Sequence, residues 1–242
     1  MMVGFIARGV TSQLRIAGII GLVLVAGACA GPVSPAPSVR EGALRYVALG
    51  DSYTIGTSVS EEERWPNQVV ARMEDELALV ANLGVNGYTS HDLITDELPA
   101  LDELEPDLVT VQIGVNDVVQ GVPDTVYAQN VAIILDALLE RLPADRILAV
   151  ATPDYTLTPQ GGSFGDPEQQ RDGIVRNNAI LREASDERGI IFVPEIFEIS
   201  QMVVDDGSLV ASDGLHPSGA QYALWVEVIQ PAVGRLLGPG AG

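Results

Sequence analysis

The sequence predicts an α/β fold in which a mainly parallel sheet of five strands lies between two layers of helices, a three-layer α/β/α arrangement. From residue 44 onward, short apolar segments alternate with longer stretches of helical periodicity. This alternation places consecutive strands in one parallel sheet, with helices on both faces and right-handed crossovers. The segment Leu108–Ile113 is almost continuously apolar, and the stretch Asp124–Leu142 is apolar on one side only. These patterns are typical of a strand buried on both faces and of a helix packed against a sheet.

Each predicted strand is a short, mainly apolar run, and the third follows the turn signal Pro106-Asp107. In chain order, the predicted strands are Leu44–Leu49, Leu79–Leu83, Asp107–Ile113, Arg146–Ala151 and Gly189–Val193. The predicted helices, which follow the strands in turn, are Trp65–Ala78, Ser90–Leu104, Asp124–Leu142, Pro167–Arg188 and Ser218–Leu237.

The composition excludes several classes of protein. The chain has 242 residues, 47% hydrophobic and 19% charged, which fits one globular domain with additional segments. Its formal net charge of −20 argues against a nucleic-acid partner, because a phosphate backbone requires a basic surface. All 13 basic residues are Arg, which excludes Schiff-base and P-loop lysine chemistry. Two His and one Cys exclude histidine-rich bimetal sites, an internal disulfide and paired-cysteine metal sites, so we expect no cofactor and no metal.

The N-terminal residues predict export. Arg8 and Arg15 precede an uncharged apolar run, Ile16–Ala28. Its 13 residues are fewer than the roughly 20 that a transmembrane helix needs, and they suit the hydrophobic region of a signal peptide. We therefore predict a signal peptide over residues 1–28.

Cys29, the single cysteine, follows the small residues Ala26-Gly27-Ala28. This pattern resembles the lipobox of bacterial lipoproteins, with Ala26 where a Leu is usual. The resemblance implies lipidation of Cys29 and anchoring to the cell membrane on its extracytoplasmic side, and plain secretion is the alternative. Residues 29–43 are rich in Pro, Gly and Ser, which predicts an extended linker. The folded domain is predicted over residues 44–242.

Polar and Gly-rich segments follow three of the predicted strands and precede the last helix. In an open parallel sheet, ligands bind beyond the carboxyl ends of the strands, near the point where the strand order reverses. The segments at these positions are Gly50-Asp51-Ser52-Tyr53, residues 82–90, Gly114-Val115-Asn116-Asp117 and residues 212–217. Together they hold a Ser, Gly-rich turns, an Asn and an Asp-x-x-His, the parts of an acyl-transfer site. Taken singly, each part also has an ordinary structural role as a helix cap, a turn or a solvated side chain.

These segments resemble the sequence blocks of the SGNH hydrolase (GDSL-type lipase/esterase) superfamily over residues 44–237. In the family's order and spacing, the first, second, third and fifth blocks correspond to Gly50-Asp51-Ser52, Gly87, Gly114-Val115-Asn116-Asp117 and Asp213-Gly214-Leu215-His216. Tyr53 stands where the name-giving motif has Leu. The G-x-S-x-G pentapeptide of α/β-hydrolases is not met, because Thr54 occupies its last position.

The resemblance implies a flavodoxin-like, mainly parallel five-stranded sheet and a role for each site residue. Ser52 would be the nucleophile, His216 the base that takes its proton, and Asp213 the group that orients the imidazole. The oxyanion hole would comprise the backbone N–H groups of Ser52 and Gly87 and the side-chain amide of Asn116. A Cβ at position 87 would crowd the substrate. His91, the other histidine, is a distant competitor for the role of base, and the family pattern points to His216 instead.

The implied activity is hydrolysis of carboxylic esters, whether of small molecules, lipids or carbohydrates. Three other functions stay open: acyl transfer at the same site, a surface-anchored binding module without turnover, and a flavodoxin-like nucleotide binder. The last is disfavoured because Asp51 would lie where a phosphate sits. Residues 153–167 form a long predicted loop after the fourth strand, which we interpret as a wall or cover of the substrate site or, alternatively, as a surface insertion.

Overall fold

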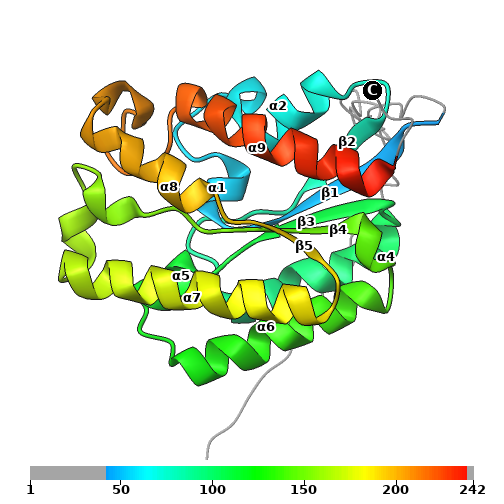
Figure 1. Cartoon of the computed structure of the whole chain (residues 1–242), viewed down its shortest axis with the longest axis horizontal. Coiled ribbons are helices and arrows are strands. Elements are labelled where there is room, and N and C mark those ends of the chain that lie inside the picture. The colour runs from blue at the N-terminus through cyan, green and yellow to red at the C-terminus, as the bar shows by residue number, and fades with distance from the viewer. Residues whose placement is uncertain (1–41, 239–242) are drawn as a thin grey trace, which may run out of the picture. The chain divides into compact units, whose positions relative to one another are not determined.

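The computed structural model describes residues 42–238 and contains one sheet of five parallel strands (Figure 1). The strands are β1 (Leu44–Gly50), β2 (Leu77–Asn82), β3 (Leu108–Gln112), β4 (Ile147–Val150) and β5 (Ile191–Val193). Their order in the sheet is β2-β1-β3-β4-β5, and each neighbouring pair is parallel. The predicted three-layer α/β/α fold with a flavodoxin-like sheet is confirmed.

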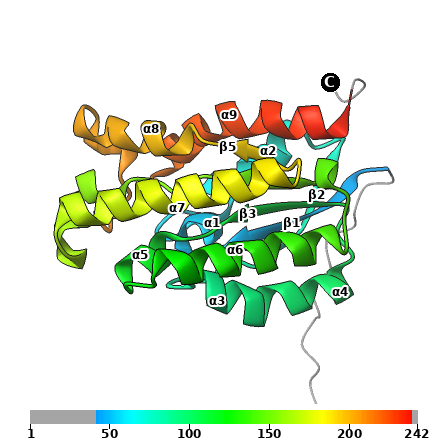
Figure 2. The same ribbon diagram turned by 60° about the horizontal axis from the view of Figure 1, so that its bottom comes forward.

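Helices connect the strands and form the two outer layers. The α-helices are α1 (Ser52–Ile55), α2 (Trp65–Arg72), α3 (Ser90–Asp92), α4 (Leu101–Leu104), α5 (Val115–Val119), α6 (Asp124–Leu139), α7 (Pro167–Glu187), α8 (Ile196–Ser200) and α9 (Gly219–Leu237). Single turns lie between them: a π-helical turn η2 (Leu93–Glu97) and the 3-10 turns η1 (Glu61–Glu63), η3 (Leu98–Ala100), η4 (Ala144–Arg146), η5 (Tyr155–Leu157), η6 (Gly161–Phe164), η7 (Gln201–Val204) and η8 (Gly207–Leu209). Helices α2, α8 and α9 cover one face of the sheet, and α4, α6 and α7 cover the other (Figure 1, Figure 2).

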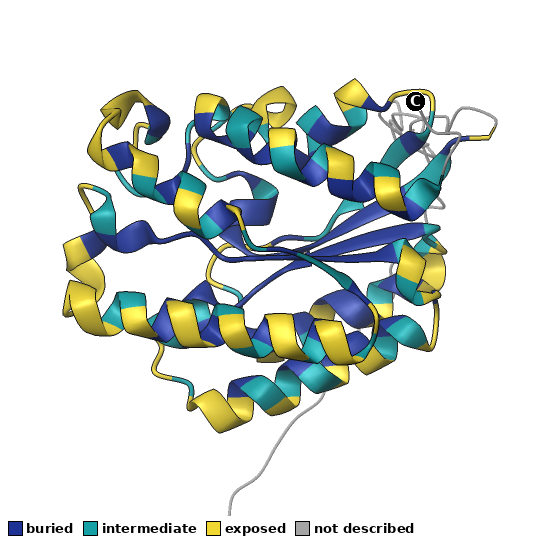
Figure 3. Cartoon of the chain, viewed as in Figure 1, coloured by how far each residue is buried: buried dark blue, intermediate teal, exposed yellow. Residues whose placement is uncertain are grey.

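The sheet is buried on both faces because side chains along each strand alternate between two apolar cores. Along β1, Tyr46 and Ala48 join the core that includes Trp225 of α9. The intervening residues, Val47 and Leu49, join the core on the side of α6. Figure 3 shows the central strands as a buried layer between helices whose outer faces are exposed, whereas the edge strands β2 and β5 are only partly buried.

The topology opens a crevice at the carboxyl ends of the central strands. From β1 the chain moves to β2 on one side, and it then crosses to β3 on the other side. The segment after β1 leads into α2 on one face, whereas the segment after β3 leads through α5 to α6 on the other. Because the two connections diverge, the ends of β1 and β3 leave room for a ligand.

The predicted helix Trp65–Ala78 is too long, and the second strand begins earlier than predicted. Helix α2 ends at Arg72, because Met73 leaves the helical region with φ −131° and ψ 38°. Leu77 then pairs with Leu44 of β1. This pairing is a long-range contact, which local periodicity does not record.

The predicted helix Ser90–Leu104 is not one regular helix. It is divided into α3, the π-helical turn η2, the 3-10 turn η3 and α4. Pro99 lies in η3, and a proline in a helix interior removes one backbone hydrogen bond. The π-helical turn that precedes it carries one more residue than an α-helical turn.

The other predicted elements match the observed ones to within three residues at each end. The short helices α1, α5 and α8, of four or five residues each, lie outside the predicted elements. The predicted signal peptide, Cys29 and linker residues 30–41 lie outside the described residues. Within residues 42–238, the structure contains no helix long and apolar enough to cross a membrane.

Candidate active site

Ser52 lies at the sharp turn between β1 and α1. It is the first residue of α1, and Asp51 caps this helix by accepting a hydrogen bond from the Tyr53 N–H at 2.9 Å. Gly50, the last residue of β1, has a φ of +152°. A Cβ at position 50 would lie 2.3 Å from the carbonyl oxygen of Gln112, so only glycine fits between β1 and β3. The turn leaves Ser52 only 7% exposed, at the carboxyl edge of the sheet.

Gly87 lies in the loop after β2 and has a φ of +84°. This left-handed conformation favours glycine. A Cβ at position 87 would meet no protein atom within 4 Å, so the backbone conformation and not crowding by the protein accounts for the residue. The open space beside Gly87 belongs to a cleft that Ser52 also lines.

Asn116 lies in the first turn of α5, directly after β3. Its Nδ2 donates to the carbonyl oxygen of Tyr88 at 2.9 Å and to Oδ2 of Asp51 at 3.4 Å. The neighbouring Asp117 is buried and accepts hydrogen bonds from the backbone N–H and the hydroxyl of Ser90. This contact joins the first residue of α3 to α5, and the hydrogen bond from Asn116 to Asp51 places Asn116 beside the Ser52 turn.

Asp213 and His216 lie in a tight turn before α9. The turn is closed by an isolated bridge between Val210 and Pro217. Asp213 Oδ2 lies 2.6 Å from His216 Nδ1, and Asp213 Oδ1 accepts the backbone N–H groups of Leu215 and His216 at 2.9 and 3.0 Å. With Nδ1 bound to the carboxylate, Nε2 is the ring nitrogen left for proton transfer.

Ser58 is a fourth donor to Asp213, and sequence reasoning missed it. Its hydroxyl donates to Oδ2 of Asp213 at 2.7 Å across 155 residues of chain. Burial alone would raise the pKa of Asp213, but the hydrogen bonds from His216, Leu215 and Ser58 hold this pKa well below its usual range. The Asp213 carboxylate is therefore charged throughout the neutral pH range.

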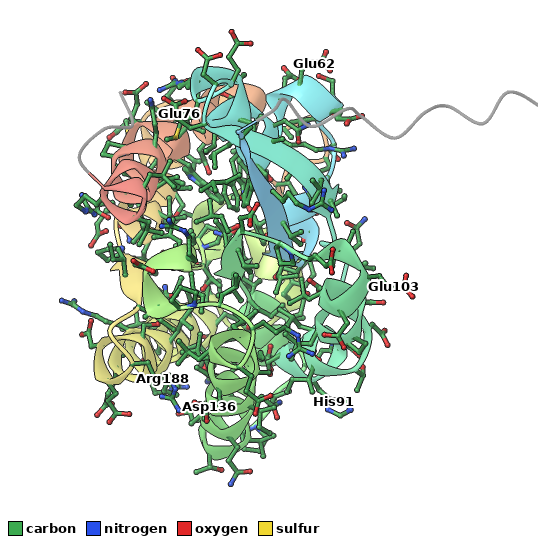
Figure 4. The ribbon with its side chains drawn as sticks, turned by 90° about the vertical axis from the view of Figure 1, so that its right-hand side faces the viewer. Glu62, Glu76, His91, Glu103, Asp136 and Arg188 are labelled. Carbon is green, nitrogen blue, oxygen red and sulfur yellow. The ribbon has the colours of Figure 1, made fainter. Side chains whose placement is uncertain are left out.

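The structure brings Ser52, Gly87, Asn116 and His216 together in the lining of one cleft. The cleft has a volume of about 160 Å³. Its remaining lining is mainly apolar and consists of Tyr53, Asn86, Val115, Val119, Tyr155, Phe164 and Leu215. His91 is exposed and points away from the body of the protein (Figure 4), so it does not reach this cleft.

Tyr53, which stands where the family motif has Leu, packs against the candidate base. Its ring centroid lies 5.2 Å from that of His216 and 6.4 Å from that of Trp225. Tyr53 is only 3% exposed. Its ring therefore limits the orientations open to the His216 imidazole.

The long loop after β4 contributes to the cleft. Tyr155 in η5 and Phe164 in η6 both line it, and their rings pack edge to face with centroids 5.5 Å apart. Asp154 holds the start of the loop, because its N–H donates to Ser200 and its carboxylate accepts the Thr156 hydroxyl. This placement favours the interpretation of residues 153–167 as a substrate wall.

Buried acids surround the Ser52 turn. Burial raises the pKa of Asp51 to about 7, although Asp51 accepts the Tyr53 N–H. Burial also raises the pKa of Glu97 to about 9 and raises the pKa of Asp117. Within the part of the chain that the structure describes, no group of three or more His, Cys, Asp or Glu side chains is placed to hold a metal ion.

A sequence profile of the GDSL-like lipase/acylhydrolase family matches residues 48–224 of this chain. The chain belongs to this family. The resemblance to the SGNH hydrolase superfamily is thereby confirmed, and at the level of the family the protein is an ester-hydrolysing enzyme, an esterase or lipase.

Relatives of the GDSL-like protein agree with this assignment. It is 28% identical over 231 residues to GDSL lipase Rv0518 of Mycobacterium tuberculosis (strain ATCC 25618 / H37Rv), a match that covers 89% of this chain and 94% of the relative. It is 23% identical over 223 residues to an acetylxylan esterase of Xylanibacter ruminicola (strain ATCC 19189 / DSM 19721 / CIP 105475 / JCM 8958 / 23), covering 81% of this chain but only 44% of that protein. Its fold resembles the crystal structure of a lipase/acylhydrolase from Enterococcus faecalis with a TM-score of 0.63 and 20% identity, covering 79% of this chain and 96% of that one.

Proposed function

We propose that this GDSL-like enzyme hydrolyses carboxylic esters through an acyl-enzyme on Ser52. The observation that carries the proposal is the pairing of His216 Nδ1 with the charged Asp213, because His216 lines the same cleft as Ser52. In the first half-reaction, His216 Nε2 takes the hydroxyl proton while Ser52 Oγ attacks the ester carbonyl carbon. The tetrahedral intermediate collapses, and the alcohol leaves with the proton held by His216. Water then repeats these steps on the acyl-enzyme and releases the acid.

The oxyanion that forms on the carbonyl oxygen would be held by the N–H groups of Ser52 and Gly87 and by Asn116 Nδ2. Of the two hydrogen bonds that Nδ2 donates, the one to Asp51 is long, at 3.4 Å. The hydrogen in that weaker bond is therefore the one available to the oxyanion. The bond to the Tyr88 carbonyl, at 2.9 Å, keeps the amide in place.

The size and lining of the cleft support esters of short acids as substrates. An apolar cavity of about 150 Å³ holds a benzene molecule, which has six carbon atoms. The cleft of about 160 Å³, lined by Val115, Val119 and Leu215, suits an acyl group of similar size. The alcohol part could belong to a small molecule, a lipid or a carbohydrate, since the relatives include a protein named lipase and one named acetylxylan esterase.

A panel of p-nitrophenyl esters of increasing acyl length, assayed beside acetylated xylan, tests both parts of this proposal. Ser52→Ala is the matched variant, since it removes one hydroxyl from a site that is 7% exposed. We expect Ser52→Ala to fold, to show only background turnover and to escape labelling by a fluorophosphonate. If the native enzyme is neither labelled nor active, the chain is a binding module and the proposal fails. Retained turnover in Ser52→Ala would also overturn it.

We further propose that the enzyme is exported and anchored to the cell membrane by a lipid on Cys29. The apolar run Ile16–Ala28 and the small residues before the single cysteine support this location. Lipoproteins carry more than one acyl chain, and two chains give stable membrane binding where one does not. Cys29→Ser should move the activity from the membrane fraction to the soluble fraction. Native enzyme that is already soluble and unlipidated would replace the anchor with plain secretion.

A further inference from the structure

Glu97 is a buried acid that the proposed mechanism does not use. It is the last residue of the π-helical turn η2 and is only 2% exposed. Its Oε2 accepts a hydrogen bond from the Gly50 N–H at 2.9 Å. Gly50 is two residues before Ser52, so Glu97 contacts the turn that carries the proposed nucleophile.

The Gly50 N–H needs a side-chain acceptor because the backbone of β2 no longer lies beside it. The carbonyl of Gly50 accepts the Val85 N–H at 3.2 Å, from the chain that has left β2. The N–H of Gly50 donates to the Glu97 side chain and not to a strand backbone. Without this acceptor, a buried amide at the end of β1 would be unpaired, which is unfavourable.

The π-helical turn explains how a glutamate comes to lie in this position. Its closing hydrogen bond runs from the Leu98 N–H to the Leu93 carbonyl, five residues apart. Such turns carry one extra residue and recur at functional sites. Here Leu93, Glu97 and Leu98 are buried, while Thr95 and Asp96 between them are exposed.

The raised pKa of Glu97 favours a protonated carboxyl group at pH 7. Burial is the main cause that raises its pKa to about 9; the Gly50 hydrogen bond opposes this shift, and the charges of Asp51 and Asp96 add to it. Asp51 faces Glu97 from the nucleophile turn, and Asp96 is its neighbour in η2. Among the described residues, the buried Oε1 of Glu97 has no hydrogen-bond partner that would stabilise a negative charge.

We propose that Glu97 is a positioning residue of this hydrolase, which fixes the Ser52 turn by accepting the Gly50 N–H. The inference rests on the proposed role of Ser52. A neutral acid supplies the acceptor without placing a negative charge behind the site where the oxyanion develops. An ionised Glu97 would still accept the hydrogen bond but would repel Asp51 and oppose the oxyanion.

The pH dependence of kcat in native enzyme, Glu97→Gln and Glu97→Leu tests this role. Gln keeps a carbonyl acceptor and cannot ionise, whereas Leu keeps the volume and loses the acceptor. Glu103→Gln, on the same connection but exposed and directed away from the protein (Figure 4), is the matched control. Thermal unfolding of each variant reports whether it is folded.

We expect Glu97→Gln to match native kcat near pH 7 and to keep it to about pH 10, where native enzyme and Glu103→Gln lose activity through a pKa of about 9. Glu97→Leu should lose about 10–100-fold in kcat with little change in KM, because the nucleophile is displaced. The inference would be overturned if native enzyme and Glu97→Gln lost kcat in parallel at alkaline pH. It would also be overturned if folded Glu97→Leu had the kcat of native enzyme. If Glu97→Leu does not fold, the comparison with Glu97→Gln alone decides. Native enzyme without turnover or fluorophosphonate labelling would overturn the role of Ser52 and this inference with it.

Discussion

Asp213→Asn is expected to remove nearly all ester turnover while the fold survives. The carboxylate accepts a hydrogen bond from His216 Nδ1 at 2.6 Å, which places the imidazole proton on Nδ1 and leaves Nε2 as the base. An Asn amide nitrogen beside Nδ1 would favour the opposite tautomer, with the proton on Nε2. It would also remove the negative charge that stabilises the imidazolium formed during attack.

The expected loss of kcat in Asp213→Asn can be compared with the smaller loss expected when Ser58, another hydrogen-bond donor to Asp213, is changed. Changing the corresponding Asp of a Ser-His-Asp triad to Asn lowers kcat by about 10⁴, or about 5.5 kcal/mol in the barrier. Ser58→Ala removes only one of four donors to Asp213 and leaves the contact with His216 in place. Because Ser58 is exposed, water replaces its hydroxyl, and we expect a loss of about tenfold or less.

The assay is steady-state hydrolysis of a short p-nitrophenyl ester by native enzyme, Asp213→Asn and Ser58→Ala, with thermal unfolding as the test of folding. A fluorophosphonate should label Asp213→Asn far more slowly than native enzyme, since Ser52 is still present but not activated. Turnover by folded Asp213→Asn within tenfold of native enzyme would refute the assignment of His216 as the base oriented by Asp213. An equal loss of kcat in Ser58→Ala would show that activity depends on the position of the Asp213–His216 turn and not on the tautomer of His216.

Three further predictions follow from the same contacts. Asn116→Ala should lower kcat by about 10²–10³ with KM little changed, because it removes one oxyanion donor; unchanged kcat would exclude this role. Phe164→Ala should shift the preferred acyl length upward in the p-nitrophenyl ester panel, since Phe164 lines the cleft, and an unchanged preference would place the acyl group elsewhere. Stability should fall as pH rises from 5 to 7: burial raises the pKa of Asp51 in the folded protein to about 7, so the unfolded chain ionises first and gains up to about 1.4 kcal/mol per pH unit. Urea unfolding at both pH values measures this, and Asp51→Asn should reduce the slope; a native stability that rises over this range would contradict it.

The positions of the candidate site residues could be predicted from sequence because the carboxyl ends of parallel strands lie at one edge of the sheet. Ser52 follows β1, Gly87 follows β2 and Asn116 follows β3, so their positions in the chain alone place them at one edge. Asp213 and His216 are three residues apart and close their contact within a single turn. For these residues, order along the chain carries the spatial information.

Residues that act through long-range contacts could not be predicted in this way. Ser58 reaches Asp213 across 155 residues, and nothing in its local sequence marks it. Glu97 lies in a stretch that predicts a regular helix, where the extra residue of a π-helical turn leaves no periodic signal. The end of α2 at Arg72 is likewise set by the pairing of Leu77 with Leu44.

In the proposed mechanism, a negative charge beside His216 helps catalysis, whereas a negative charge beside the Ser52 turn opposes it. Acidic side chains lie at both places. Asp213 is 29% exposed at its side chain and accepts four donors, so its pKa is low and its charge is present where the imidazolium forms. Asp51 and Glu97 lie behind Ser52, where burial raises the pKa of each carboxyl group to about 7 and about 9. A protonated Glu97 avoids repulsion of the developing oxyanion, whereas Asp51, with a pKa of about 7, is about half ionised at pH 7. In a chain with a formal net charge of −20, burial and hydrogen-bond donors therefore decide which acids carry charge in the site.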